Sequence, residues 1–468
     1  MRKSWLYGGR KQMAAAGLAV MLAAGAVTGC SGGTEGTAAE AGNTSSDQKA
    51  GEEKSGGTSS SALQESETKA EEEKLPEYVP VDPASVAESA EEDFIYELTD
   101  TIATITGYQG SGGQVKIPES LGGSKSIAIG KDVFNGNETI TYLYIPETVV
   151  RMESGSFRNC KALEEVYVGA NLASLDKSMF KNCTALRRAE LAGTISGIGG
   201  DMDAGAFIDC VSLTEVVFGE NLQGRIATDA FRGCMNLETV DLSGTQIGNI
   251  GQCAFADCTN LKTVKLPENL GWIESNSFLN CPSLAEFEIA EGNGVLEEEA
   301  GIVYTVDFCS SYSPNTAMFG LAGALEADVT VREGTEIIAS NAFEYIQTIK
   351  SVKIPDSVKE IERLAFGACY ELEKVEFGNG LETIGQSAFN GCESLEEIDL
   401  PDSLQELGST AFGFCNLKRV SLPDGVKYYK GETTEDYIFA MNKDAVFTYK
   451  GKEYTYDQAA ELDALLAQ

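Results

Sequence analysis

Residues 384–401 of this chain read IGQSAFNGCESLEEIDLP, and residues 361–377 read IERLAFGACYELEKVEF. Both follow one template, Ile-x-x-x-Ala-Phe-x-x-Cys-x-x-Leu-x-x-Val-x-Leu-Pro, with small substitutions. A fixed period in this range predicts a solenoid, because one unit cannot bury its own apolar face and needs neighbours on both sides. The template phenylalanine recurs most often at 23-residue intervals, at positions 134, 157, 180, 207, 231, 255, 278, 343, 366, 389 and 412.

The Val-x-Leu step of each unit predicts a short strand with both apolar residues facing inward. Stacked units turn these strands into a parallel sheet, and the upstream Ile-Gly or Ile-Glu step is expected on the opposite wall. Prolines such as Pro146 and Pro401 follow directly, where a missing N–H ends the strand without breaking the sheet. Little sequence remains for long helices.

A cysteine stands three residues after nine of the phenylalanines. Units stacked in register lie about 4.8 Å apart, whereas a disulfide needs Cβ atoms about 3.5–4.5 Å apart, so disulfides along the stack are not expected. Zinc sites need clustered pairs, and no Cys-x-x-Cys occurs. We therefore predict a buried ladder of small side chains, formed by Cys160, Cys183, Cys210, Cys234, Cys258, Cys281, Cys369, Cys392 and Cys415.

The repeat residues resemble the BspA-like leucine-rich repeats, a 23-residue bacterial and protist variety, over about residues 94–430. Residues 94–118, FIYELTDTIATITGYQGSGGQVKIP, are also similar to the N-terminal segment of that family. The resemblance implies a leucine-rich-repeat solenoid that is displayed on a surface and binds other molecules. It names no ligand. We expect N-terminal coils over residues 91–289 and C-terminal coils over residues 336–423.

An irregular interruption is expected at residues 290–335. Phe278 and Phe343 are 65 residues apart instead of 23, and the excess of 42 is close to two coils without the signature. Residues 294–296 and 301–304 indicate a hairpin, and residues 329–331 a recovered strand. Ile346 and Asn137 occupy the cysteine position of their units, so we expect the cysteine to serve packing and not a required chemistry.

Residues 424–468 are expected to form a small α/β cap. VFTYKGKEYTY at 446–456 alternates about a Lys-Gly-Lys turn, and residues 457–466 have helical spacing. A cap closes the open end of a repeat stack. The predicted fold class is therefore mainly β, a parallel solenoid with short turns or 3-10 segments and one small cap.

Residues 1–29 indicate an export signal, with a basic start and an apolar stretch too short to favour a permanent membrane helix. Val27-Thr28-Gly29-Cys30 resembles a lipoprotein lipobox, which implies cleavage before Cys30 and lipid on its thiol. Residues 30–90 are rich in Gly, Ser and Glu and predict a disordered tether. These features favour a lipid-anchored protein on the outer face of a bacterial membrane or envelope.

The chain is strongly acidic and has no histidine. It holds 35 basic and 72 acidic residues. Removing residues 1–29 would take away four basic residues and leave a formal net charge of 31 − 72 = −41. This charge argues against nucleic acid or an anionic lipid surface as a partner. The missing histidine excludes Ser-His and Cys-His catalysis, so we expect no enzyme and no cofactor. An enzyme here would need carboxylates, as in pectinase-like β-helices, but the acids alternate with basic residues and Thr.

Some residues leave alternatives open. Asp201 and Asp203, and the three glutamates at 297–299, could bind calcium, but neither set has the spacing of a known calcium loop, and we expect no metal site. Cys253 and Cys309 lie off the ladder, as free thiols or as a bridged pair.

A ligand patch is predicted at the N-terminal end of the strand face, at Tyr142, Tyr144, Tyr167 and Arg188. Tyrosine is a rigid aromatic group with a hydroxyl, which favours protein and sugar recognition. It also simply suits strand surfaces. The leading hypothesis is a non-catalytic surface protein that binds an extracellular protein or glycan. The alternative is a passive envelope component or a capture accessory of a transporter.

Overall fold

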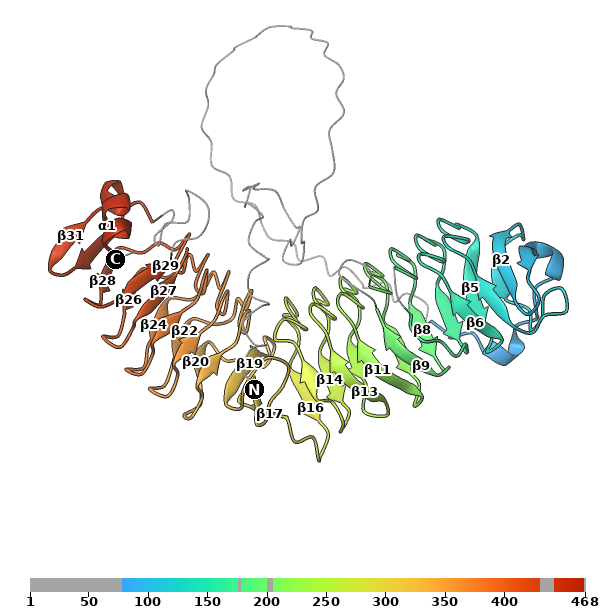
Figure 1. The fold of residues 1–468 in the computed structure, drawn as a ribbon, viewed down its shortest axis with the longest axis horizontal. Coiled ribbons are helices and arrows are strands. Elements are labelled where there is room, and N and C mark those ends of the chain that lie inside the picture. Colours follow the sequence, from blue (N-terminus) through green and yellow to red (C-terminus); the bar gives the residue numbers. More distant parts are fainter. Residues whose placement is uncertain (1–77, 176–177, 200–204, 430–441, 467–468) are drawn as a thin grey trace, which may run out of the picture. The chain divides into compact units, whose positions relative to one another are not determined.

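A computed structural model describes residues 78–175, 178–199, 205–429 and 442–466 of the chain. The expected export signal, Cys30, most of the expected tether and the pair Asp201 and Asp203 lie outside the described residues. The residues from Val81 onward form one compact unit, a parallel β-solenoid (Figure 1).

One wall of the solenoid carries the predicted Val-x-Leu strands. Its strands pair in register with the next coil, as Val166 of β7 pairs with Leu143 of β5 and Ala189 of β8. The wall comprises β3 (Gly113–Lys116), β5 (Ile140–Ile145), β7 (Glu165–Val168), β8 (Arg188–Leu191), β10 (Glu215–Phe218), β12 (Thr239–Asp241), β14 (Thr263–Leu266), β16 (Glu286–Ile289), β20 (Asp328–Thr330), β22 (Ser351–Lys353), β24 (Lys374–Glu376), β26 (Glu397–Asp399), β28 (Arg419–Leu422), β30 (Val446–Tyr449) and β31 (Lys452–Tyr454).

The opposite wall carries the expected Ile-Gly and Ile-Glu steps, again mostly as parallel strands. Ile361 pairs with Ile384, and Ile384 with Leu407. This wall comprises β1 (Phe94–Leu98), β2 (Ala103–Tyr108), β4 (Ile127–Ile129), β6 (Val149–Met152), β9 (Ile195–Ile198), β11 (Leu222–Ile226), β13 (Gln246–Ile250), β15 (Trp272–Ile273), β17 (Leu296–Glu299), β18 (Ile302–Thr305), β19 (Thr316–Gly320), β21 (Ile337–Ile338), β23 (Glu360–Ile361), β25 (Thr383–Ile384), β27 (Glu406–Gly408) and β29 (Lys427–Tyr429).

Stacked phenylalanine rings fill the turn between the walls. The rings of Phe231 and Phe255 lie 5.3 Å apart and almost parallel, and those of Phe343 and Phe366 lie 4.8 Å apart. These rings are completely buried. The stack is therefore the core of the solenoid, and it explains the period, because each coil must deliver one ring at the same height.

Each turn bends through a left-handed residue two positions after its phenylalanine. Asn182 (φ 61°), Asp257 (φ 61°) and Gly391 (φ 80°) hold this place, and these residue types tolerate positive φ. Ala368 (φ 54°) holds it as well, although alanine adopts the conformation at a cost of about 1–2 kcal/mol.

The nine ladder cysteines are buried free thiols, as predicted. Their role goes beyond small size. The Cys183 Sγ donates to the Phe157 carbonyl at 3.2 Å, and the Cys369 Sγ donates to the Phe343 carbonyl at 3.0 Å. All nine repeat this bond to the phenylalanine of the previous coil, so the thiols link successive turns.

The interruption contains the predicted hairpin, formed by antiparallel β17 and β18 around Ala300 and Gly301, both at positive φ. The expected strand at 329–331 appears as β20. The expectation of two stacked coils is wrong. Only β19 and β20 continue the parallel walls, because the hairpin runs antiparallel to β19 instead of forming a second coil. Phe319 takes the ring position next to Phe278, at 5.7 Å.

The tether was expected to extend to residue 90, but residues 81–90 belong to the solenoid unit. The Val81 N–H donates to the Glu165 Oε2 at 2.9 Å, and the Ser89 N–H donates to the Lys116 carbonyl at 3.0 Å. Two 3-10 turns follow this path, η1 (Pro83–Ser85) and η2 (Glu91–Asp93). The polar composition of this segment gave no sign of these contacts, because they are made by backbone groups.

The C-terminal end has the predicted strand–turn–strand and helix. β30 pairs in parallel with β28, and β31 returns antiparallel along β30. The 3-10 turn η3 (Tyr456–Gln458), with a capping box from Thr455 and Gln458, leads into α1 (Ala459–Leu466). Phe447 and Leu462 are fully buried, so this segment packs onto the last coil as a cap.

Candidate functional site

Two rows of side chains run across the N-terminal strands of the first wall. One row is Lys116, Tyr144, Tyr167 and Glu190, on β3, β5, β7 and β8. The other is Gln114, Tyr142, Glu165 and Arg188, on the same strands. We call them the tyrosine row and the glutamate row. The predicted patch is therefore divided between two rows with different surroundings.

Tyr144 and Tyr167 form a stacked pair in the tyrosine row. Their ring centroids lie 4.8 Å apart with 10° between the planes, and the Lys116 Nζ lies 4.6 Å from the Tyr144 ring centroid. Both rings are partly exposed. Partial burial raises the pKa of both phenols, so both stay protonated and can donate hydrogen bonds at neutral pH. The pair offers a fixed aromatic surface next to one cation.

Tyr142 does not belong to a ligand patch, which corrects the sequence-based prediction. Its side chain is 2% exposed and its hydroxyl has no hydrogen-bond partner among the described residues. The segment at 81–89 is bonded to Glu165 and Lys116 on the two strands that flank β5, and it covers this position. Burial, with Glu165 and Glu190 nearby, raises the pKa of Tyr142.

The Arg188 side chain also forms its ion pairs within the protein. Its guanidinium lies 3.0 Å from Glu165, 2.8 Å from Glu190 and 3.1 Å from Glu215, and its side chain is 12% exposed. Burial alone would lower its pKa, but the three carboxylates outweigh burial and raise it. Arg188 therefore holds three strands together and is not an open contact point for a ligand.

The remaining predicted sites have simple surroundings. Arg332 forms ion pairs with Glu297 and Glu299, which shows how that acidic run is partly neutralised. In the described part of the chain no group of three or more acids or cysteines is arranged to hold a metal ion. Cys309 is a buried free thiol, so the alternative of a bridge between Cys253 and Cys309 is wrong.

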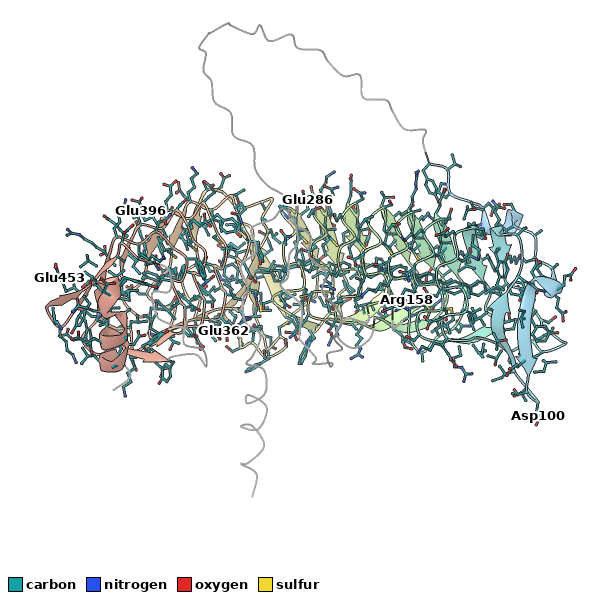
Figure 2. All side chains as sticks on the ribbon, turned by 90° about the horizontal axis from the view of Figure 1, so that it is seen from above. Asp100, Arg158, Glu286, Glu362, Glu396 and Glu453 are labelled. Atoms are coloured by element: carbon teal, nitrogen blue, oxygen red, sulfur yellow. The ribbon has the colours of Figure 1, made fainter. Side chains whose placement is uncertain are left out.

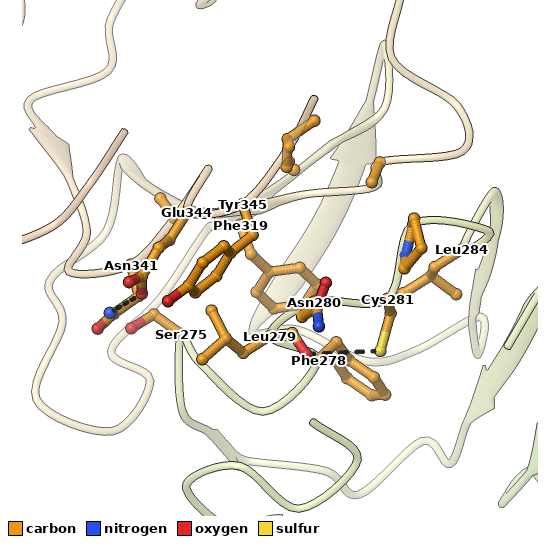
Figure 3. Close-up of a pocket in the computed structure, with 15 residues that line it drawn as sticks. Ser275, Phe278, Leu279, Asn280, Cys281, Leu284, Phe319, Asn341, Glu344 and Tyr345 are labelled. Carbon is orange, nitrogen blue, oxygen red and sulfur yellow. Dashed lines mark hydrogen bonds between the residues drawn. The ribbon is translucent and has the colours of Figure 1, made fainter. Parts of the chain in front are cut away.

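A small cavity lies where the N-terminal coils, the interruption and the C-terminal coils meet, lined by Ser275, Phe278, Phe319, Asn341, Glu344 and Tyr345 (Figure 3). Its volume is about 20 Å³, enough for about one water molecule. Glu344 is 8% exposed and accepts a hydrogen bond from the Asn341 amide. Burial raises the pKa of Glu344 to about 7, although Asn341 and Arg363 oppose the shift. The cavity is too small for an organic ligand.

A wider groove of about 500 Å³ lies in the cap. Lys427, Lys450 and Lys452 line it together with Tyr449 and Tyr454. The Lys452 Nζ lies 4.3 Å from the Tyr454 ring centroid and donates to Glu461 at 2.7 Å. Both tyrosine rings are about 5% exposed, so the groove lacks an open aromatic floor.

Sequence reasoning overlooked exposed apolar side chains in the interruption and in the coil before it. Trp272 on β15 is 42% exposed, and Phe308 is 72% exposed. One signal was available: Trp272 and Trp5 are the two tryptophans of the chain, and Trp272 occupies an outward position of a repeat.

The fold defines a class, the leucine-rich-repeat solenoids. A family model described as a BspA type leucine rich repeat region matches residues 113–223, 201–300 and 321–443, in six copies. The chain belongs to this family of BspA-type leucine-rich repeats.

Solved structures agree on the fold. A leucine rich cell surface protein from Faecalibacterium prausnitzii is 23% identical with a TM-score of 0.56, covering 82% of this chain and 98% of that one. A leucine-rich repeat protein from Bacteroides ovatus is 20% identical with a TM-score of 0.50, covering 76% and 98%. A search of curated proteins finds no match for this chain. Among the described residues no helix has the length and apolar character needed to cross a membrane.

Proposed function

We propose that this chain is a lipid-anchored cell-surface protein that binds an extracellular protein or glycan and performs no catalysis of its own. The observation that supports binding best is the stacked pair of Tyr144 and Tyr167 beside Lys116. Aromatic rings held rigidly at a surface lose little entropy when a ligand packs on them. Membership in a repeat family with extended exposed walls supports the same conclusion.

The anchor is a separate part of the proposal and rests on the lipobox resemblance at residues 27–30. Replacing Cys30→Ala in the producing bacterium tests it. We expect the wild-type chain in the membrane fraction with incorporated labelled fatty acid, and the variant without the label. Equal labelling of both chains would contradict lipid attachment at Cys30.

The binding test applies the purified full-length chain to an array of matrix proteins, mucins and glycans at physiological salt. A double variant, Tyr144→Ala with Tyr167→Ala, is compared with Tyr370→Ala, which removes an exposed ring elsewhere. We expect a saturable hit that the double variant weakens by at least about fivefold and the control leaves unchanged.

An unchanged hit would contradict the tyrosine row as the binding site. Silence across the array would favour the alternative function, a passive envelope component or a capture accessory of a transporter.

A further inference from the structure

A second exposed surface lies at the interruption, on the wall opposite the tyrosine row. It consists of Trp272, Val306 and Phe308, which are 42%, 40% and 72% exposed, and we call it the Trp272 surface. It lies beside β17, which Figure 1 labels. Large apolar side chains that gather on a soluble surface mark sites of interaction.

Hydrogen bonds hold the parts of this surface together. The Glu274 Oε1 accepts from the Trp272 Nε1 at 2.8 Å and from the Ser310 Oγ at 2.9 Å. The Cys309 Sγ lies 3.9 Å from the Ile273 carbonyl, and the Val306 N–H donates to the Val295 carbonyl at 2.9 Å. The loop that carries Phe308 is therefore fixed against the edge of β15, and Trp272 keeps one orientation.

The charged side chains of the segments that carry this surface, such as Glu274 and Asp307, are acidic, and the cation Arg225 lies two strands away from Trp272 in the same row of the wall. Residues 266–331 contain eleven acidic residues and no lysine or arginine, and of these acids Glu286, Glu288 and Asp328 belong to β16 and β20 on the first wall, away from this surface (Glu286 is labelled in Figure 2). The two cations that flank this stretch in the sequence form ion pairs. Lys265 pairs with Glu288, and Arg332 pairs with Glu297 and Glu299. Within the described residues, neither Glu274 nor Asp307 has a cation within ion-pair distance.

We propose that the Trp272 surface binds a cationic polypeptide segment, with lysine or arginine side chains over the Trp272 and Phe308 rings. The faces of the two aromatic rings attract cations. Glu274 and Asp307 would face the same cations, and the acidic field would steer a basic partner toward the surface. A second copy of this chain is disfavoured, because both copies carry a large negative charge. A neutral sugar would use the rings but leave the carboxylates without a role.

The test uses tryptophan fluorescence of the full-length chain with Trp5→Phe, which leaves Trp272 as the single tryptophan. The probe is a short peptide of alternating lysine and glycine, and the matched peptide has glutamate in place of lysine. We expect the lysine peptide to change the Trp272 emission saturably, and the glutamate peptide to leave it unchanged.

Variants separate a site from general attraction to an acidic protein. Phe308→Ala changes no charge, and we expect it to weaken the affinity for the lysine peptide at least about fivefold. Tyr370→Ala and the double variant of Tyr144 and Tyr167 should bind as the parent does, which keeps this result independent of the proposed function. An unchanged affinity in Phe308→Ala, or an emission change with a neutral oligosaccharide but not with the lysine peptide, would overturn the proposal.

Discussion

At the scale of single residues, the cysteines do two things at once. Each fills a small buried space and donates its S–H to a carbonyl that faces it from the previous coil. Burial raises the pKa of Cys281 and of Cys369 to about 12, so both are thiols and not thiolates at neutral pH. Since the thiolate is the reactive form, these side chains are protected against oxidation.

Glu344 makes the stability of the junction depend on pH. Its pKa is about 7 in the folded state and about 4.5 when exposed, so the folded state binds the proton more tightly. The resulting stabilisation is complete below pH 4.5 and is lost as the pH rises through 7. We expect Glu344→Gln to raise the free energy of unfolding by about 1–3 kcal/mol at pH 8 and to change it little at pH 5.

Urea unfolding at the two pH values measures this difference. Glu371→Gln, at an exposed position, is the matched control, and its effect on the free energy of unfolding should be the same at pH 5 and pH 8. An equal effect of Glu344→Gln at pH 5 and pH 8 would show that ionisation of this carboxyl does not oppose folding.

At the scale of elements, the two ends of the solenoid are closed in different ways. The N-terminal end has the antiparallel pair of β1 and β2, and the C-terminal end has the β30–β31 hairpin with α1. Both place a non-repeating segment against the first or last coil. Open strand edges invite pairing with other chains, and such segments prevent it.

Phe447 tests how much the cap contributes. Its side chain is fully buried in β30. We expect Phe447→Ala to cost about 3–5 kcal/mol, because it leaves a cavity between the cap and the last coil. Hydrogen exchange should rise mainly at β28 to β31, and the coils near β7 should stay protected. Phe308→Ala, at an exposed position, should change stability by less than about 0.5 kcal/mol. Uniform loss of protection along the chain would contradict a local role.

The strands and turns could be predicted from the sequence because each repeats with the same local rule. Val240 and Ile398 point inward as the alternation requires. Tyr142 could not be placed, because its burial depends on residues 81–89, which are distant in sequence and bind through their backbone. Phe319 was missed for a related reason, since the interruption follows no template, and the role of Trp272 depends on Phe308 and Ser310 of that same interruption.

At the scale of the whole molecule, both walls are interrupted at the same place. β16 ends one sheet of the first wall and β15 ends one sheet of the second. The contacts across the junction include side-chain contacts of several kinds, such as the Ser275 Oγ donating to the Ser340 carbonyl at 2.6 Å and the rings of Phe278 and Phe319 at 5.7 Å. Where a sheet of the first wall ends inside a block, between β10 and β12 or between β24 and β26, a ladder on the second wall still joins the coils, whereas at the junction the described residues show no ladder on either wall.

We therefore expect the coils before and after the interruption, residues 81–289 and 337–466, to unfold in separate steps. Repeat proteins lose cooperativity where the contact between neighbours is weak. Hydrogen exchange followed by mass spectrometry along a urea titration measures the two midpoints. A single midpoint for both blocks would show that the junction couples them as strongly as the ladders do.

The bond from each thiol to the phenylalanine carbonyl behind it has a consequence for how such a gene can change. Each of the nine coils that carry the cysteine supplies one donor and one acceptor at the same places, so a copy of such a coil inserted next to another would find both hydrogen-bond partners in position. Unequal recombination can thus add or remove 23-residue units without new compensating mutations. The length of the displayed wall is then a heritable variable, adjustable one coil at a time.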